Sequence, residues 1–223
     1  MKRNQSGFTL IEIAIVLVII GLLLGGVLKG QELINSTKVK NLATDFRNIP
    51  VYINGYQDKY KALPGDDANV VLHLGATAIL ATTPGTVGNG VIEGAWNSTT
   101  NTDESFLFWQ HIRLAGFGPG STTITDPSYL PTNTVGGRIG VTNSLANNPI
   151  TLPTPLQGTY VVCSDGIPGK FAKQLDTTLD DGNTQTGSLM VTAAGTVAGG
   201  TSIPTTGAIA IIDDKPYLVC MGY

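Results

Sequence analysis

One long apolar segment opens the chain. It runs from Phe8 to Leu28 as FTLIEIAIVLVIIGLLLGGVL, and Glu12 is its only charged residue. About twenty apolar residues form a helix long enough to cross the hydrocarbon core of a bilayer. A carboxylate inside such a segment is energetically costly, so Glu12 calls for a functional explanation.

An apolar stripe with helical spacing continues beyond this segment. Its members follow one another at steps of four, three, four, three and four: Leu42, Phe46, Ile49, Ile53, Tyr56 and Tyr60. This period predicts one helix over residues 8–61, of which residues 8–28 are the transmembrane part. Pro50 removes a backbone donor. Because the stripe continues in phase, we expect Pro50 to kink the helix rather than end it.

Residues 62–223 have a different composition, rich in Gly, Thr, Asn and Pro. This composition is typical of a loop-rich globular head that contains β-strands. One short helix is predicted with Thr102 or Asp103 as its N-cap, and a second over residues 167–182. Strands are predicted over residues 138–142, 159–164, 188–193, 207–213 and 216–220. These elements predict an α+β fold in which the long N-terminal helix packs on one face of an antiparallel sheet.

Charge and motifs exclude several classes of function. Charged residues make up only 13% of the chain, the net charge is −3, and no Lys/Arg cluster indicates a nucleic-acid partner. His73 and His111 have no metal-ligand spacing, and a turn explains Ser164-Asp165 better than a nucleophile does. We therefore predict no enzymatic activity, no catalytic residues and no metal ligands.

The two cysteines, Cys163 and Cys220, both lie in the C-terminal part of the chain. An even pair beyond a membrane-crossing segment indicates one disulfide in an oxidising compartment. The alternative is a pair of buried thiols.

Three interpretations of the N-terminus each meet an objection. A cleaved signal peptide agrees with Lys2 and Arg3, but the apolar run is too long and lacks an A-x-A cleavage site. A plain membrane anchor gives no reason for the carboxylate of Glu12 inside the apolar segment. A buried soluble helix is disfavoured by the length of the apolar run.

A fourth interpretation rests on GFTLIE, residues 7–12. This stretch, its short basic leader and the apolar run that follows resemble the processing site of type IV prepilins and type II secretion pseudopilins. The resemblance implies that prepilin peptidase removes residues 1–7 by cutting between Gly7 and Phe8, and then methylates the Phe8 amine. It also supports the disulfide, because many pilins close a C-terminal loop with one.

The resemblance gives Glu12 a role in filament assembly. Glu12 of one subunit would attract the Phe8 amine of a neighbour, and residues 8–28 would form the filament core; the alternative is that Glu12 reaches the lipid headgroups. The implied partners are other pilin subunits, prepilin peptidase and an inner-membrane assembly machinery. The implied location is the bacterial inner membrane, N-terminus cytoplasmic and head periplasmic, before assembly into an extracellular pilus or a periplasmic pseudopilus.

Several alternatives stay open at this point. Within the filament class, the chain is a pilin, a minor or priming pilin, or a secretion pseudopilin; outside it, the chain is an anchored binding module or a secreted enzyme. We predict no cofactor, with calcium as the alternative. Oxygen ligands lie beside glycines in LPGDD, GNGVIEG (88–94) and LDDGNT (179–184), but ordinary Asp/Asn/Gly turns explain these segments better than a calcium site does.

Overall fold

The computed structural model describes residues 10–223. The chain divides into two compact units, Met1–Lys38 and Val39–Tyr223. Helix α1 (Leu10–Tyr60) contributes to both, and it continues through Pro50 as the sequence predicts. The predicted leader 1–7 and Phe8 lie outside the described residues.

The second unit is built on the C-terminal part of α1. Most of the predicted stripe is buried in this unit. The buried residues of α1 include Leu42, Phe46, Ile49, Ile53 and Tyr56, whereas Tyr60 is half-buried. The stripe joins one hydrophobic cluster with α3 (Glu104–Leu114) and with residues of the sheet. A buried, large aliphatic or aromatic side chain contributes about 1.5–3 kcal/mol, so this stripe is a major source of the stability of the unit.

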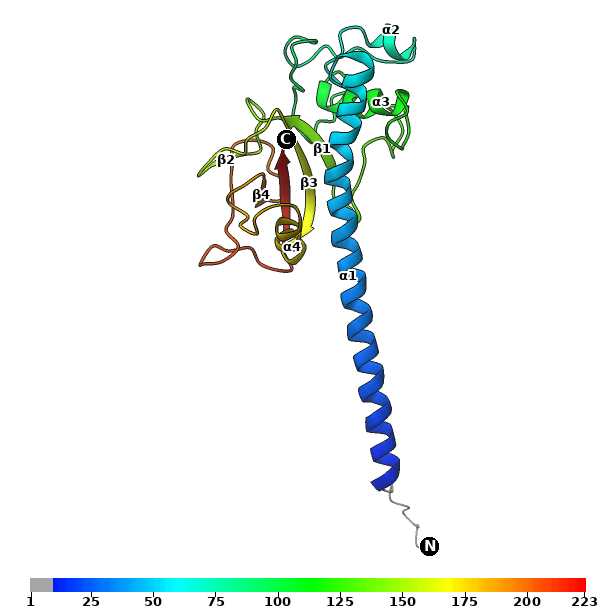
Figure 1. Ribbon diagram of the computed structural model, residues 1–223, viewed down its shortest axis with the longest axis vertical. Coiled ribbons are helices and arrows are strands. Elements are labelled where there is room, and N and C mark those ends of the chain that lie inside the picture. The colour runs from blue at the N-terminus through cyan, green and yellow to red at the C-terminus, as the bar shows by residue number, and fades with distance from the viewer. Residues whose placement is uncertain (1–9) are drawn as a thin grey trace, which may run out of the picture. The chain divides into compact units, whose positions relative to one another are not determined.

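The main sheet has four antiparallel strands in the order β1-β3-β6-β4 (Figure 1). They are β1 (Ile139–Asn143), β3 (Tyr160–Pro168), β4 (Leu189–Ala193) and β6 (Pro216–Gly222). The structure therefore confirms the α+β class and four of the predicted strands. A second, parallel pair consists of β2 (Ile150–Leu152) and β5 (Gly200–Thr201), which the sequence did not reveal.

Both faces of the main sheet are buried, and alternate residues point to opposite faces. Val162 and Val219 join the cluster that contains α1 and α4 (Gly169–Leu179). Their neighbours Val161 and Leu218 join a second cluster, which Trp96, Ile150 and Leu156 cover. The loop regions thus supply a second hydrophobic layer opposite α1.

The structure departs from the sequence prediction in two predicted elements and in one helix that was not predicted. Residues 207–213 form turns instead of a strand, because both edges of the following strand, β6, are already paired with β3 and β4. Helix α4 begins at Gly169 and not at Ile167, since Ile167 pairs with Tyr217 in the sheet. The short helix α2 (Val70–Leu74) lies where the sequence analysis predicted no element.

Cys163 and Cys220 occupy directly opposite positions on β3 and β6, are fully buried, and form a disulfide. The structure confirms the predicted pairing. The bond joins the two central strands of the sheet on the face covered by Trp96.

Removing this disulfide should lower the free energy of unfolding of the head by about 4 kcal/mol, because it links residues 57 positions apart. The test is urea unfolding of the full chain in detergent micelles, for the wild type and for the double variant Cys163→Ala, Cys220→Ala. Both tryptophans lie in the second unit, so their fluorescence reports on the head. Dithiothreitol should lower the urea midpoint of the wild type and leave that of the double variant unchanged. Equal midpoints for all samples would contradict the prediction.

Candidate functional site

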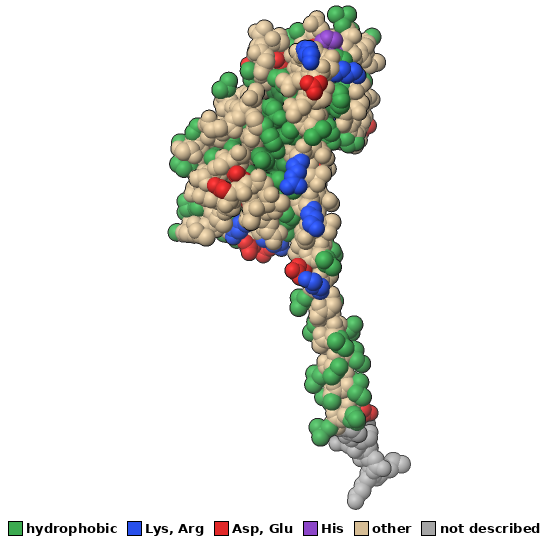
Figure 2. Space-filling view, in the orientation of Figure 1, with side chains coloured by type: hydrophobic (Ala, Val, Ile, Leu, Met, Phe, Trp, Pro, Cys, Tyr) green, Lys and Arg blue, Asp and Glu red, His purple; other side chains and the backbone are tan. Residues whose placement is uncertain are grey.

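The N-terminal part of α1 exposes apolar surface. Every large hydrophobic residue from Leu10 to Leu28 is exposed, with exposed fractions between 46% and 94%. Figure 2 shows these side chains along the visible face of the helix. This helix is long and apolar enough to cross a membrane. A helix that is apolar all round needs lipid or other protein around it, and this surface is the first candidate site.

Glu12 lies in the first turn of α1 as described, and its side chain is exposed. It is the only charged residue between Leu10 and Leu28. The N-terminal end of a helix carries a partial positive charge, which favours a carboxylate there. The other predicted site residues, Gly7 and Phe8, lie outside the described residues.

Two of the three predicted calcium segments come together in the head. Asp66 of LPGDD accepts hydrogen bonds from the backbone amides of Gly88, Asn89 and Gly90, which belong to GNGVIEG. N–H donors repel a cation, so this geometry fits a clamp that holds the loop and not a calcium site.

Glu104, the first residue of α3, completes this clamp. It is buried, accepts a hydrogen bond from the Glu93 amide at 2.7 Å, and lies close to Asp66. Burial raises the pKa of Glu104 well above its usual value, and the negative charges of Asp66 and Glu93 add to this rise against the opposing Glu93 amide. Glu104 therefore holds a proton at neutral pH.

The two histidines lie near each other although they are distant in sequence. Asp67 accepts hydrogen bonds from the Tyr56 hydroxyl at 2.7 Å and from His73 at 2.6 Å. Burial alone would raise the pKa of Asp67, but these bonds and one from the Asn69 amide lower it below its usual value. Burial also lowers the pKa of His111 to about 4. The His111 ring is neutral. Its Nδ1 accepts a hydrogen bond from the Gly65 amide, so Nε2 carries the proton and donates a hydrogen bond to the Ile79 carbonyl.

This network connects α1, α2 and α3 at one end of the head. It lines part of a pocket of about 430 Å³ together with Tyr60 and Lys61. The partners of these polar groups lie within the protein, which is the arrangement expected of a buried structural network.

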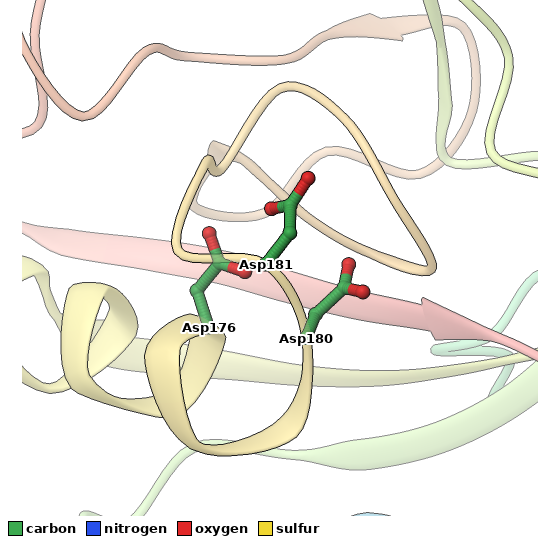
Figure 3. Close-up of side chains that lie close together, drawn as sticks. All are labelled: Asp176, Asp180 and Asp181. Atoms are coloured by element: carbon green, nitrogen blue, oxygen red, sulfur yellow. The ribbon is translucent and has the colours of Figure 1, made fainter.

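The third predicted calcium segment belongs to a group of three carboxylates. Asp176, Asp180 and Asp181 lie at the C-terminal end of α4, and their oxygens come within 4.8 Å of one another (Figure 3). The predicted segment LDDGNT contains Asp180 and Asp181, whereas Asp176 was not predicted as a ligand. Asp176 could have been found from its spacing, because it precedes Asp180 by four residues and residues four apart lie on the same side of a helix.

A comparison with known families matches the N-terminus. The family described as "Prokaryotic N-terminal methylation motif" matches residues 2–28. The chain carries a prepilin-type signal. The prepilin-type match covers the leader, Gly7, Phe8, Glu12 and the apolar segment, and it leaves the head unmatched. No curated protein and no solved structure matches the chain. The prepilin-type signal and the apolar helix together support membrane anchoring of the chain.

The clamp predicts a pH effect. The unfolded chain releases the Glu104 proton near its usual pKa of 4.5, whereas the folded chain keeps it to higher pH. The stabilisation that Glu104 contributes is therefore complete below pH 4.5 and is lost as pH rises through the raised pKa, by at most about 1.4 kcal/mol per pH unit. Glu104→Gln cannot ionise, so its free energy of unfolding relative to wild type should grow with pH.

Urea unfolding at a series of pH values from 4 to 9 measures this difference. Glu32→Gln is the matched control, because Glu32 is exposed and pairs with Lys29 on α1. A difference between Glu104→Gln and wild type that stays constant with pH would show that Glu104 is ionised in the folded head.

Proposed function

We propose that the chain is a structural subunit of a type IV pilus-like filament. In this proposal prepilin peptidase cuts between Gly7 and Phe8 and methylates the new Phe8 amine. The mature subunit polymerises through residues 8–28, and residues 62–223 form the globular head on the filament surface. The observation that carries the proposal is the prepilin-type signal at residues 2–28, joined to a helical segment whose large hydrophobic residues from Leu10 to Leu28 are all exposed.

The exposed apolar surface explains why the subunit needs neighbours. The exposed apolar segment is unstable in water, because each large side chain left in water forgoes about 1.5–3 kcal/mol of burial free energy. In the proposed pathway, lipid tails surround these apolar side chains before assembly, and the helices of other subunits bury them afterwards. Lipid tails are as apolar as leucine, however, so hydrophobicity alone cannot select the filament over the membrane.

Glu12 supplies this selection. Cleavage would create a positive amine on Phe8, four residues before Glu12. In a medium of low dielectric constant, opposite charges attract strongly and a missing partner is costly. A contact between Glu12 of one subunit and the Phe8 amine of the next would set the axial register of the filament. In this proposal the N-terminus of the membrane-inserted subunit lies in the cytoplasm and the head lies in the periplasm.

A pseudopilin of a type II secretion system is the second candidate, and a minor or priming pilin is the third. The buried disulfide favours a pilin that works outside the cell. The predicted calcium alternative favours a pseudopilin, because some of the pseudopilins that the chain resembles carry calcium in a head loop. The partners are then other subunits of the same kind and the inner-membrane machinery.

Replacing Glu12 should abolish assembly without affecting membrane insertion. In Glu12→Ala the Phe8 amine of the neighbour lacks its partner, so we expect at least a tenfold loss of subunit from sheared filaments, with normal amounts in the membrane fraction. Glu32→Ala, on the same helix, is the matched control and should assemble normally, since the exposed Lys29–Glu32 pair contributes little. Normal filaments from Glu12→Ala would refute the assembly role and favour an anchored binding module.

Processing can be tested by intact-mass spectrometry of the chain from its native host. The expected mass is that of residues 8–223 with a methylated N-terminus, in both the membrane and the sheared filament fraction. The same mass in the membrane fraction alone would favour a pseudopilin or a minor subunit. A chain that still begins at Met1 would refute processing at Gly7, and one that lacks residues 8–28 would indicate a secreted protein.

A further inference from the structure

A second cavity of the head, of about 190 Å³, lies between α1, α3 and the loop from α3 to β1. Its walls are mostly apolar or aromatic and include Ile49, Tyr52, Trp109, Ile112, Pro119 and Pro131. One carboxylate, that of Asp45 on α1, belongs to the same lining. The cavity shares no residue with the histidine network at the end of α1 or with the three carboxylates after α4.

Asp45 has an unusual environment for a carboxylate. It is half-buried, and within the part of the chain that the structure describes its side chain forms neither a hydrogen bond nor an ion pair. Burial raises the pKa of Asp45 to about 6, so the group is ionised at pH 8. A partly desolvated charge without a partner is unfavourable, and a bound cation would relieve it.

Helical spacing explains how this carboxylate reaches the cavity. Asp45 follows Leu42 by three residues and precedes Ile49 by four, so it lies on the side of α1 that carries the buried stripe. Asn48 and Thr132 also line the cavity, and their side chains form no hydrogen bonds among the described residues. The amide oxygen of Asn48 and the hydroxyl of Thr132 are further acceptors for a ligand that donates hydrogen bonds.

The one cationic side chain in the lining is committed to other partners. Arg113 Nε donates to the Pro119 carbonyl at 2.9 Å, and Nη1 donates to the Ser121 carbonyl at 2.9 Å and to the Tyr129 carbonyl at 2.6 Å. The guanidinium therefore holds the loop that follows α3, and among the described residues it forms no ion pair with Asp45. Since Arg113 belongs to α3 and Asp45 to α1, an additional cation is expected on the α1 side of the cavity.

The size of the cavity limits what it can hold. An engineered apolar cavity of about 150 Å³ accommodates benzene, whereas drug-sized ligands occupy about 300–1,000 Å³. A volume of about 190 Å³ therefore suits a stem of a few carbon atoms. A lysine side chain has this form, because a flexible apolar stem ends in a compact ammonium group that donates several hydrogen bonds.

We propose that this cavity binds a primary ammonium group carried on a short apolar stem. The ammonium lies against Asp45, with Asn48 and Thr132 as further acceptors, and the stem lies between the apolar walls. Two sources present this chemistry: a lysine side chain of a second copy of the chain, and a free alkylamine. The first source rests on the proposed filament function, whereas binding of the ammonium itself does not require polymerisation.

A fluorescence titration of the full chain in detergent micelles at pH 8 tests the site. The ligand is Nα-acetyl-lysine methylamide, and the signal is tryptophan emission, since Trp109 lines the cavity. We expect a saturable change with a Kd in the millimolar range, because the ligand is small. Nα-acetyl-norleucine methylamide has the same stem without the ammonium, and it should bind at least tenfold more weakly.

Variants distinguish binding at Asp45 from a general attraction to acidic surface. Asp45→Asn should bind the lysine analogue at least tenfold more weakly. Without ligand its Tm at pH 8 should equal or exceed that of the wild type, because an unpaired, half-buried charge is removed. Asp58→Asn is the matched control, since Asp58 is an exposed aspartate of α1 outside the cavity lining, and it should keep the wild-type affinity.

Carbodiimide cross-linking distinguishes the two sources. This reagent activates a carboxylate, which then forms an amide bond with an adjacent amine. In the membrane fraction and in sheared filaments from the native host, a peptide that joins Asp45 to a lysine of another chain would identify the second copy. Binding of the lysine analogue without this cross-link would identify a free amine. The titration uses the isolated chain, so failure of the site is distinguishable from failure of the filament proposal.

Four results would overturn the proposal. They are no saturable change with the lysine analogue in the wild type, equal affinity for the lysine and norleucine analogues, unchanged affinity in Asp45→Asn, and a clear fall in the Tm of Asp45→Asn without ligand. The last result would show that Asp45 stabilises the head through a partner of its own.

Discussion

Burial of one stripe of α1 is the contact on which the head depends. Leu42, Phe46, Ile49 and Ile53 lie in the same hydrophobic cluster as residues of α3, α4 and one face of the main sheet. The C-terminal residue extends this contact, because the Tyr223 hydroxyl donates to the Phe46 carbonyl of α1 at 2.7 Å. The chain thus closes on its own first helix, and the same helix carries the apolar segment that the proposed filament requires.

The second face of the sheet is stabilised differently. Trp96 comes from a loop rich in glycine and threonine, packs over the Cys163–Cys220 disulfide, and donates its indole N–H to the Thr196 carbonyl at 2.8 Å. Its function is structural, as expected for a buried aromatic side chain. A head with few charged residues and long loops gains its second layer in this way, and the disulfide joins the two strands at its centre.

Buried carboxylates in the head have contrasting partners. Asp66 faces backbone amides, and Asp67 faces a tyrosine and a histidine. Asp176 has no hydrogen bond of normal geometry; burial, with the charges of Asp181 and Asp180, raises its pKa to about 7 against the opposing Gly182 amide. The contrast matters, because the first two arrangements are complete within the protein, whereas the third leaves a charge that a proton or a cation can neutralise.

The sequence by itself determined the apolar helix, the position of Glu12, the prepilin-type signal and four strands of the main sheet, because these depend on local composition and on periods of 3.6 and 2 residues. Only the tertiary structure decided that Asp66 clamps the 88–90 loop, that residues 207–213 find no strand partner, and that Asp176 joins Asp180 and Asp181 as a buried group. Strand partners and burial depend on which distant segments pack together. That packing brings together residues up to 177 positions apart, as for Phe46 and Tyr223, a separation that no local pattern reveals.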